Sequence, residues 1–336
     1  MKLSPVLLNL EFQDPVLLVS IPQKARNILF DCGYCFRLKV KDMQKIDSIF
    51  ISHTHIDHFA GFDHILRLSL DCEKTVKIFG PPGIIKNIAG KLAGYTWNLT
   101  EKVFLNFQVT EIYEDRLLTR KFIGKDGFSA ETLEYEEDNS FTIEMPVQVT
   151  PEYSAYACVL DHKTPVIAYK VAAVPSYNAD IQKIKKLGLE PGKWVGELKE
   201  KVAELGFEAG GEIEVNGENR PVSELSHEII VKRTGTSFAF IVDTIFSKTT
   251  AKKMIQFCNG VQKLYCECAY LTEERDLARQ NYHLTARQAA TLAAEAGVQE
   301  LIPIHFSRRY EGSYEKLYKE AKEKFENVKV AIKYGE

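Results

Sequence analysis

The chain has 336 residues, of which 45% are hydrophobic and 26% charged, and its formal net charge at pH 7 is −3. This composition is that of an ordinary globular protein that buries a large core. It provides no global basic surface, so it excludes nucleic-acid binding through overall charge and requires a local patch for any such substrate.

The N-terminal residues and the cysteines indicate where the protein works. The apolar run at residues 1–8 is too short for a secretory signal, and no apolar stretch approaches the about 18 to 20 residues that span a bilayer. Seven cysteines, an odd number, lie mostly within apolar runs. They favour buried free thiols over a zinc knuckle or a redox pair at Cys32 and Cys35. We therefore expect a cytoplasmic protein without membrane contact.

The first part of the chain alternates strands with helices. Strands are expected at residues 26–31, 49–51 and 75–79, and helical spacing follows the last of them from Ile84 to Tyr95. This order is typical of an α/β fold. Beyond it the pattern changes to short β runs, which are expected at 103–110, 141–149, 154–160 and 165–171.

The stretch from residue 175 to 225 differs from both patterns. Six lysines surround residues 187–195, which contain glycine, proline and Trp194. We interpret 175–225 as an inserted arm-like segment, too short and too polar for a core of its own, within a single domain that spans residues 1–336. Its lysines fit an RNA-binding exosite, but interspersed acidic residues fit an ordinary amphipathic surface helix equally well, so both interpretations stay open.

The last third returns to strands followed by helices. Strands are expected at 237–242, 263–269 and 300–304. Asp243 and His305 follow the first and the third of these strands, and Glu267 lies within the second. Between the second and the third, Thr285 begins a capping box that opens an alanine-rich helix just after His283.

The strongest chemical signal follows the second expected strand. It is the run His53-x-His55-x-Asp57-His58, and half of the chain's eight histidines lie within twelve residues here. Side chains two apart on an extended segment point the same way, so His53 and His55 can bind one metal ion, while Asp57 and His58 face a second position. Imidazole with carboxylate suits zinc, and two ions about 3.5–4 Å apart serve hydrolytic displacements. A chance cluster of loop histidines is the ordinary alternative.

Further ligands are expected at other strand ends, because four side chains leave two ions undercoordinated. His162, Asp243 and His305 each follow an expected strand, where a rigid element places a side chain at the edge of a sheet. Singly, each has an ordinary explanation as a turn or capping residue. With the first cluster they make seven ligands, enough for two ions, which we expect to be zinc, with manganese or iron as alternatives.

Together these motifs resemble the metallo-β-lactamase-fold hydrolases and, within that superfamily, tRNase Z (ribonuclease Z). The run from His53 to His58 is similar to the superfamily signature, and His162, Asp243-Thr244 and His305-Phe-Ser-Arg-Arg-Tyr310 are similar to the later ligand motifs. The resemblance implies an αββα sandwich of two mixed β-sheets with outer helices. The ligand sets that it implies are His53, His55 and His162 for one zinc ion and Asp57, His58 and His305 for the other, with Asp243 bridging them.

Two further matches imply catalysis on RNA. Glu267 and His283 resemble the pair that manages protons at the scissile phosphate in tRNase Z, and residues 187–199 resemble the arm that holds tRNA in that family. The implied reaction is phosphodiester hydrolysis at the 3′ side of precursor tRNA, by a hydroxide that bridges the two zinc ions and that Asp57 orients. A homodimer is the implied assembly. The expected phosphate-binding groups are Thr285, Arg308 and Arg309.

Departures from the family pattern place the chain in a divergent branch. Ile56 and Val242 stand where glycine is usual, and residues 10–15 replace a glycine-rich opening turn. None of these changes removes a ligand, so hydrolytic chemistry is expected, but a small-molecule hydrolase for thioesters, lactones or cyclic phosphodiesters is the alternative. The seven ligands disfavour a non-catalytic scaffold. His55 stands where redox di-iron relatives usually have glutamate, which disfavours that chemistry.

Overall fold

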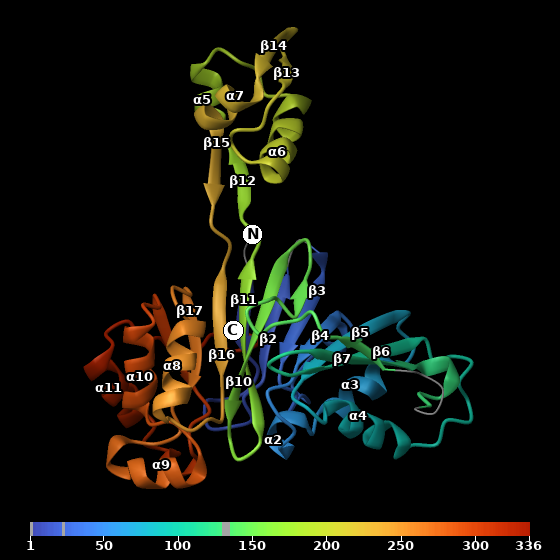
Figure 1. Cartoon of the computed structure of the whole chain (residues 1–336), viewed down its shortest axis with the longest axis vertical. Coiled ribbons are helices and arrows are strands. Elements are labelled where there is room, and N and C mark those ends of the chain that lie inside the picture. The colour runs from blue at the N-terminus through green and yellow to red at the C-terminus, as the bar shows by residue number, and fades with distance from the viewer. Residues whose placement is uncertain (1–2, 22–23, 130–134) are drawn as a thin grey trace. The chain divides into compact units, whose positions relative to one another are not determined.

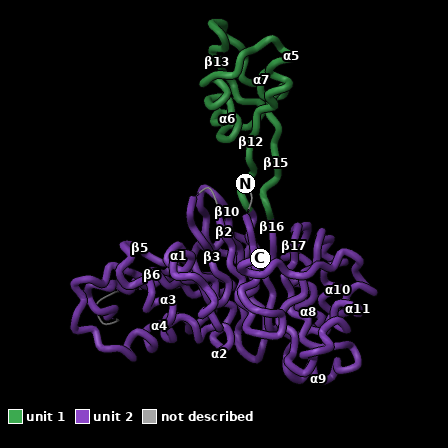
Figure 2. Tube along the Cα trace, turned by 180° about the vertical axis from the view of Figure 1, so that it is seen from behind, with its two compact units in different colours: residues 1–2, 173–236 green, residues 3–172, 237–336 purple. Residues whose placement is uncertain are grey.

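The structure is a computed structural model that describes residues 3–21, 24–129 and 135–336. Contacts divide this part of the chain into two compact units (Figure 2). Unit 1 comprises residues 173–236, and unit 2 comprises the described residues of 3–172 and 237–336. Every predicted metal ligand belongs to unit 2.

Unit 2 contains two mixed β-sheets (Figure 1). The first has eight strands, hydrogen-bonded in chain order: β1 (Ser4–Leu7), β2 (Leu17–Ile21), β3 (Arg26–Phe30), β4 (Ile46–Phe50), β5 (Lys74–Gly80), β6 (Leu105–Ile112), β7 (Leu117–Ile123) and β8 (Glu136–Asp138). The second has six strands, in the order β18 (Glu300–Ile304), β17 (Lys263–Glu267), β16 (Ser237–Ile241), β11 (Pro165–Ala173), β10 (Tyr153–Asp161) and β9 (Gln148–Val149). β3 to β6 run parallel, as do β16 to β18, so in each sheet the carboxyl ends of these strands meet at one edge.

Helices cover the outer face of each sheet (Figure 1). α3 and α4 pack on the first sheet, and α8, α10 and α11 pack on the second. The helices of unit 2 are α1 (Val40–Met43), α2 (Ile56–Phe59), α3 (Phe62–Ser69), α4 (Ile84–Ala93), α8 (Lys248–Phe257), α9 (Arg275–Asn281), α10 (Ala286–Glu295) and α11 (Glu315–Lys324). Its 3-10 turns are η2 (Gly124–Asp126), η3 (Thr272–Glu274) and η4 (Arg308–Tyr310).

Alternation along the strands explains why the first sheet packs on both faces. Leu29 of β3 and Ile49 of β4 join the hydrophobic cluster under α3 and α4. The next residues, Phe30 and Phe50, stack on the opposite face with their centroids 4.9 Å apart. Both rings contact Tyr169 of β11, at 6.0 and 5.2 Å. Because successive side chains of a strand point to opposite faces, aromatic rings fill the space between the two sheets.

The predicted αββα sandwich of two mixed sheets is therefore confirmed. The strand predicted at residues 141–149 is wrong in extent, since only Gln148 and Val149 pair, as β9. Pro146, which has no amide hydrogen to donate to a neighbouring strand, precedes this pair. In the described part of the chain, no helix combines the length and the apolar character that crossing a bilayer requires.

Unit 1 has a small hydrophobic core of its own. Its elements are β12 (Ser176–Ala179), α5 (Ile181–Lys186), α6 (Lys193–Leu205), β13 (Glu212–Val215), β14 (Glu218–Pro221), α7 (Val222–Ile229) and β15 (Ile230–Arg233). Trp194, Leu198 and Val202 lie on one face of α6 and pack in a buried cluster with Ile184 of α5 and Leu225 of α7. The expectation that this segment is too polar for a core is therefore wrong, because its apolar residues recur at helical spacing on one face.

Candidate metal centre

The first four predicted ligands lie directly after β4. His53 and His55 occupy the loop that follows the strand, and Asp57 and His58 lie in the short helix α2. Two hydrogen bonds connect the residues just before this loop, Ile51 and Ser52, to the second sheet. The Tyr169 hydroxyl donates to the carbonyl oxygen of Ile51 at 2.8 Å, and the Ile167 amide donates to that of Ser52 at 2.9 Å.

The later predicted ligands lie at the ends of three other strands. His162 follows β10, Asp243 follows β16 and His305 follows β18. Asp243 and His305 have φ angles of 49° and 54°, in the left-handed region, and so does Asp31 after β3, at 54°. Residues other than glycine rarely adopt this conformation, which costs on the order of 1–3 kcal/mol each and is concentrated at functional sites.

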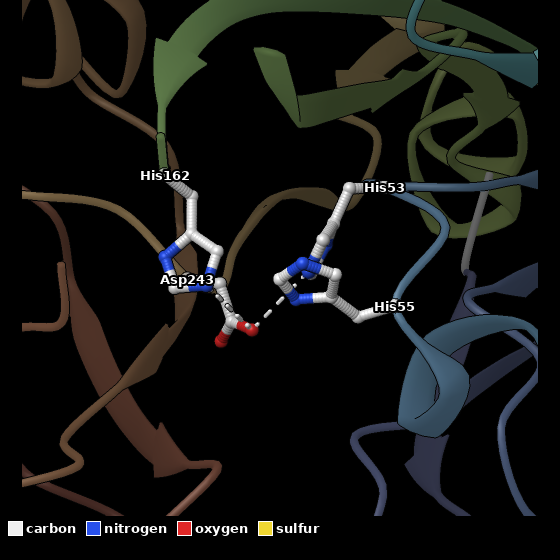
Figure 3. Close-up of side chains that lie close together, drawn as sticks. All are labelled: His53, His55, His162 and Asp243. Atoms are coloured by element: carbon white, nitrogen blue, oxygen red, sulfur yellow. Dashed lines mark ion pairs between the residues drawn. The ribbon is translucent and has the colours of Figure 1, made fainter. Parts of the chain in front are cut away.

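All seven predicted ligand side chains converge around Asp243. Its Oδ2 atom lies 3.1 Å from the Nε2 atom of His58, 3.5 Å from that of His53 and 3.9 Å from that of His162, and its Oδ1 atom lies 2.8 Å from Nε2 of His305. Figure 3 shows His53, His55 and His162 turned toward this carboxylate. Three groups of potential ligand atoms share Asp243, and the atoms of each group lie within 4.8 Å of one another: His53, His55, His162 and Asp243; Asp57, His58, Asp243 and His305; and Asp243, Glu267 and His283.

The donor set fits two metal ions. The Nε2 atoms of His53 and His58 are buried, and neither makes a hydrogen bond within the described residues, although both lie near Asp243. Burial lowers the pKa of His53 to about 2, so its ring is neutral and has a lone pair available. Burial also disfavours the charged form of His58, but Asp243 and Asp31 raise the pKa of this residue well above its usual value. The negative charges of Asp243 and Asp31 that favour a proton on His58 also favour a metal cation at this position. Metal binding by these residues stays a prediction.

Asp31 accepts a hydrogen bond from the ring nitrogen of His58 that does not face Asp243, a role that the sequence analysis did not predict. The Nδ1 atom of His58 donates to Asp31 Oδ2 at 2.7 Å. Ser52 donates to the same carboxylate from its amide at 2.6 Å and from its hydroxyl at 2.8 Å. His162 is held similarly, because its Nδ1 atom lies 2.8 Å from the carbonyl oxygen of Tyr282. Such contacts fix the ring orientation and leave Nε2 free to bind a metal ion.

His283 and Glu267 form a pair beside the ligands. Glu267 is fully buried, and its Oε2 atom lies 2.7 Å from Nδ1 of His283. Its Oε1 atom accepts from the amide of Thr244 at 2.8 Å, which fixes the carboxylate. Burial alone would lower the pKa of His283, but Glu267 and Asp243 raise it to about 9. The imidazolium is therefore the main form at neutral pH, as a general acid requires.

The three predicted phosphate-binding residues differ in their surroundings. Arg308 lines a cavity of about 420 Å³ together with His283 and five of the predicted ligands, which are His55, Asp57, His162, Asp243 and His305. Thr285 is buried, and its hydroxyl accepts from the amide of Gln288 as the N-cap of α10, so the structure does not bring it into the cavity. The guanidinium of Arg309 forms an ion pair with Glu274. These contacts account for Thr285 and Arg309 without a phosphate.

Comparison with known proteins identifies the family. Residues 26–174 match the beta-lactamase superfamily domain. Over 288 residues the chain is 33% identical to ribonuclease Z of Deinococcus radiodurans, and the alignment covers 84% of this chain and 83% of that relative. The chain belongs to the ribonuclease Z family.

A second relative agrees with this assignment, and two solved structures share the fold. Ribonuclease Z of Protochlamydia amoebophila is 30% identical over 289 residues, covering 85% of this chain and 77% of the relative. The metallo-beta-lactamase fold protein YhfI from Bacillus subtilis superposes with a TM-score of 0.57 at 16% identity, covering 98% of this chain and 95% of that one. The short form of human tRNase Z superposes with a TM-score of 0.53 at 15% identity, covering 99% and 96%. These two structures share the fold.

Membership in the ribonuclease Z family confirms the resemblance stated from the motifs. It also confirms that the chain is a metal-dependent hydrolase. The identity and the number of the metal ions stay predictions, as do the individual roles of the ligand residues. The clustered histidines and carboxylates fit a metal site.

Proposed function

We propose that this member of the ribonuclease Z family is an endoribonuclease that hydrolyses a phosphodiester bond at the 3′ side of precursor tRNA with two zinc ions. The observation that carries the proposal is that the His283–Glu267 pair lies beside Asp243, the residue predicted to bridge the two ions. Nδ1 of His283 lies 3.6 Å from Asp243 Oδ1. A phosphodiester with an alkoxide leaving group needs both a cationic site and a proton donor. This cavity provides candidate ligands for the cations and, in His283, a candidate proton donor.

The ions, when bound, would activate a water molecule and stabilise the charge that develops on the phosphate oxygens. Seven side chains would hold them: His53, His55, Asp57, His58, His162, Asp243 and His305. Asp57, whose pKa is held low despite burial by its contact with His58, stays ionised and can orient the attacking water. His283 donates a hydrogen bond to Glu267 through Nδ1. Its other ring nitrogen, Nε2, can therefore donate a proton to the leaving oxygen as the P–O bond breaks.

The finer assignments follow from this reaction. Precursor tRNA is the proposed partner, and the cytoplasm is the proposed compartment because such a substrate is handled there. Unit 1 is the proposed exosite: Lys183, Lys185 and Lys186 of α5 are exposed, and none has an ion-pair partner among the described residues. Exposed cations of this kind can contact RNA phosphates. A homodimer is the proposed assembly.

The test compares precursor tRNA with bis(p-nitrophenyl) phosphate as substrates of the zinc-loaded protein. We expect cleavage at one 3′ position of the tRNA, mapped by end-labelling, and its loss in Asp57→Ala. Asp115→Ala, which removes a carboxylate whose side chain is 76% exposed, is the matched control and should behave as wild type. Hydrolysis of the small ester without cleavage of precursor tRNA would refute the tRNA assignment and favour the small-molecule alternative.

A further inference from the structure

An exposed aromatic and basic surface lies between β3 and α1. Tyr34 and Phe36 are 49% and 61% exposed, and their ring centroids lie 5.3 Å apart. The ring of Phe36 lies 4.3 Å from that of His64, in the first turn of α3. We call this group, with the cations described below, the aromatic–basic surface: Tyr34, Phe36, Arg37, Lys39, Lys41 and His64. Three adjacent rings on a protein surface are unusual, because large apolar groups are normally buried.

Buried neighbours hold the backbone segment that carries these rings. Cys35 and Leu38, on the same loop, are buried in the core of the first sheet and anchor it. The amide side chain of Asn9 donates to the carbonyl oxygen of Tyr34 at 3.0 Å, which fixes the backbone between the two rings. Tyr34 and Phe36 are therefore held in place by their neighbours while their own side chains stay accessible. Such a preformed surface binds a ligand at little entropic cost.

Unpaired cations accompany the rings. Arg37, Lys39 and Lys41 are exposed, and none of the three side chains forms an ion pair with a described residue. The whole chain has a net charge of −3, so this local excess of positive charge is a property of the segment and not of the protein. Aromatic rings interleaved with free cations provide stacking for bases and attraction for phosphates, the combination that binds single-stranded nucleic acid.

The two residues that precede the aromatic–basic surface in the chain contact the predicted metal loop. The amide of Cys32 donates to the carbonyl oxygen of His58 at 2.8 Å, and the amide of Gly61 donates to that of Cys32 at 2.6 Å. Gly33 packs so closely on this loop that a Cβ atom there would lie 1.8 Å from the carbonyl oxygen of Asp57. The rings begin one residue later. The proposed stacking surface thus begins, along the chain, next to a residue that packs on the metal loop.

We propose that the aromatic–basic surface binds unpaired nucleotides of the RNA substrate that flank the scissile phosphate, with Tyr34, Phe36 and His64 stacking on bases. This proposal rests on the proposed endoribonuclease function and adds the residues that position the strand. The cations favour RNA over a second protein, because an apolar protein interface has few charged residues at its centre. None of these six residues is a predicted metal ligand.

The experiment measures binding of a single-stranded oligoribonucleotide and the steady-state cleavage of precursor tRNA by the zinc-loaded full chain. Tyr34→Ala/Phe36→Ala should raise the dissociation constant about tenfold for each ring removed. It should raise KM for precursor tRNA and leave the hydrolysis of bis(p-nitrophenyl) phosphate unchanged. Tyr314→Ala, at an exposed tyrosine before α11, is the matched control and should leave both constants as they are.

Two further variants separate the contributions. Tyr34→Leu/Phe36→Leu keeps apolar volume without a flat ring and should bind RNA as weakly as the alanine variant. Arg37→Ala/Lys39→Ala/Lys41→Ala should reduce the slope of log Kd against log salt by about 2, since each phosphate contact on a single strand contributes about 0.7.

Each other outcome has a defined meaning. Unchanged RNA binding and KM in both ring variants would overturn the proposal, and so would an equal loss of activity on the small ester. A change of the oligomeric state with unchanged RNA binding would overturn it too and would make the surface a contact between copies of the chain. Failure of the wild type to cleave precursor tRNA would instead defeat the proposed function.

Discussion

Asp31 and His58 form a fully buried pair, with Nδ1 of the imidazole 2.7 Å from the carboxylate. Burial raises the pKa of Asp31 above its ordinary value, while the His58 contact and two bonds from Ser52 favour its ionised form. A carboxylate in this position orients a ligating imidazole and increases its basicity. Asp31 is thus a positioning residue for the proposed metal centre.

Asp31→Asn should weaken metal binding about ten- to a hundredfold, as loss of such supporting carboxylates does elsewhere. Competition with a chromogenic zinc chelator measures the effect. Asp63→Asn is the matched control, because Asp63 forms a partly exposed ion pair with Lys91 at 2.8 Å. Equal zinc affinity in wild type and Asp31→Asn would contradict the assigned role.

Glu267→Gln should shift the pH dependence of cleavage. His283 donates a proton only below its pKa, which Glu267 helps to raise to about 9 against the opposing effect of burial. Without the charge of Glu267 the pKa falls, so the alkaline decline of kcat should begin at lower pH than in wild type. Profiles for Glu295→Gln, at an exposed position, should overlay those of wild type. An unshifted alkaline limb in Glu267→Gln would show that the Glu267–His283 pair does not determine the pKa of the proton donor.

His283→Ala should distinguish substrates by their leaving groups. Cleavage of precursor tRNA should fall about 10²- to 10⁴-fold, the usual contribution of a general acid. Hydrolysis of bis(p-nitrophenyl) phosphate should fall much less, because p-nitrophenolate leaves without a proton. A comparable loss on both substrates would point instead to a structural role for His283 in the metal centre.

Arg308 and Arg309 should behave differently although they are adjacent. Arg308 lines the cavity, so Arg308→Ala should raise KM for precursor tRNA through loss of one phosphate contact. The side chain of Arg309 pairs with Glu274 and lies 5.4 Å from the ring centroid of Tyr270. Arg309→Ala should therefore leave KM close to that of wild type. The reverse order of effects would support the prediction that Arg309 binds the substrate.

Replacing residues 176–233 by a short glycine–serine linker should separate cleavage of precursor tRNA from hydrolysis of the small ester. The hydrophobic cluster of unit 1 consists of its own residues, so unit 2 should keep its fold, its metal affinity and its activity on the small ester. Cleavage of precursor tRNA should fall strongly because the proposed exosite is missing. Undiminished cleavage would remove unit 1 from substrate binding. Circular dichroism and metal analysis test whether unit 2 is intact.

The sequence pattern predicted an α/β fold and the residues that converge at its strand ends, and the family resemblance implied the four-layer sandwich. Ligands at strand ends follow from the strand pattern, because parallel strands bring their carboxyl ends to one edge. The role of Asp31 could not be read in this way. It looks like an ordinary turn residue, and its partner His58 lies 27 residues later, so only the parallel pairing of β3 with β4 reveals the contact.

Local patterns also predicted more than the tertiary structure supports. The capping box predicted at Thr285 is confirmed, whereas phosphate binding by the same hydroxyl stays a prediction for a side chain that is buried and accepts the capping bond. The apolar face of α6 was hidden among charged residues, so the core of unit 1 was missed. The exposure of Tyr34 and Phe36 cannot be deduced from composition, because the alternation with buried Cys35 is set by packing against the first sheet.

The bond from Tyr169 to the carbonyl oxygen of Ile51 has a mechanical consequence for catalysis. It couples the sheet that bears His53 to the sheet that bears Asp243, at a position two residues before His53. Neither sheet can slide over the other without breaking this link and disturbing the rings packed around it. The spacing between the predicted ligands carried by the first sheet and those carried by the second is thus set by a rigid interior.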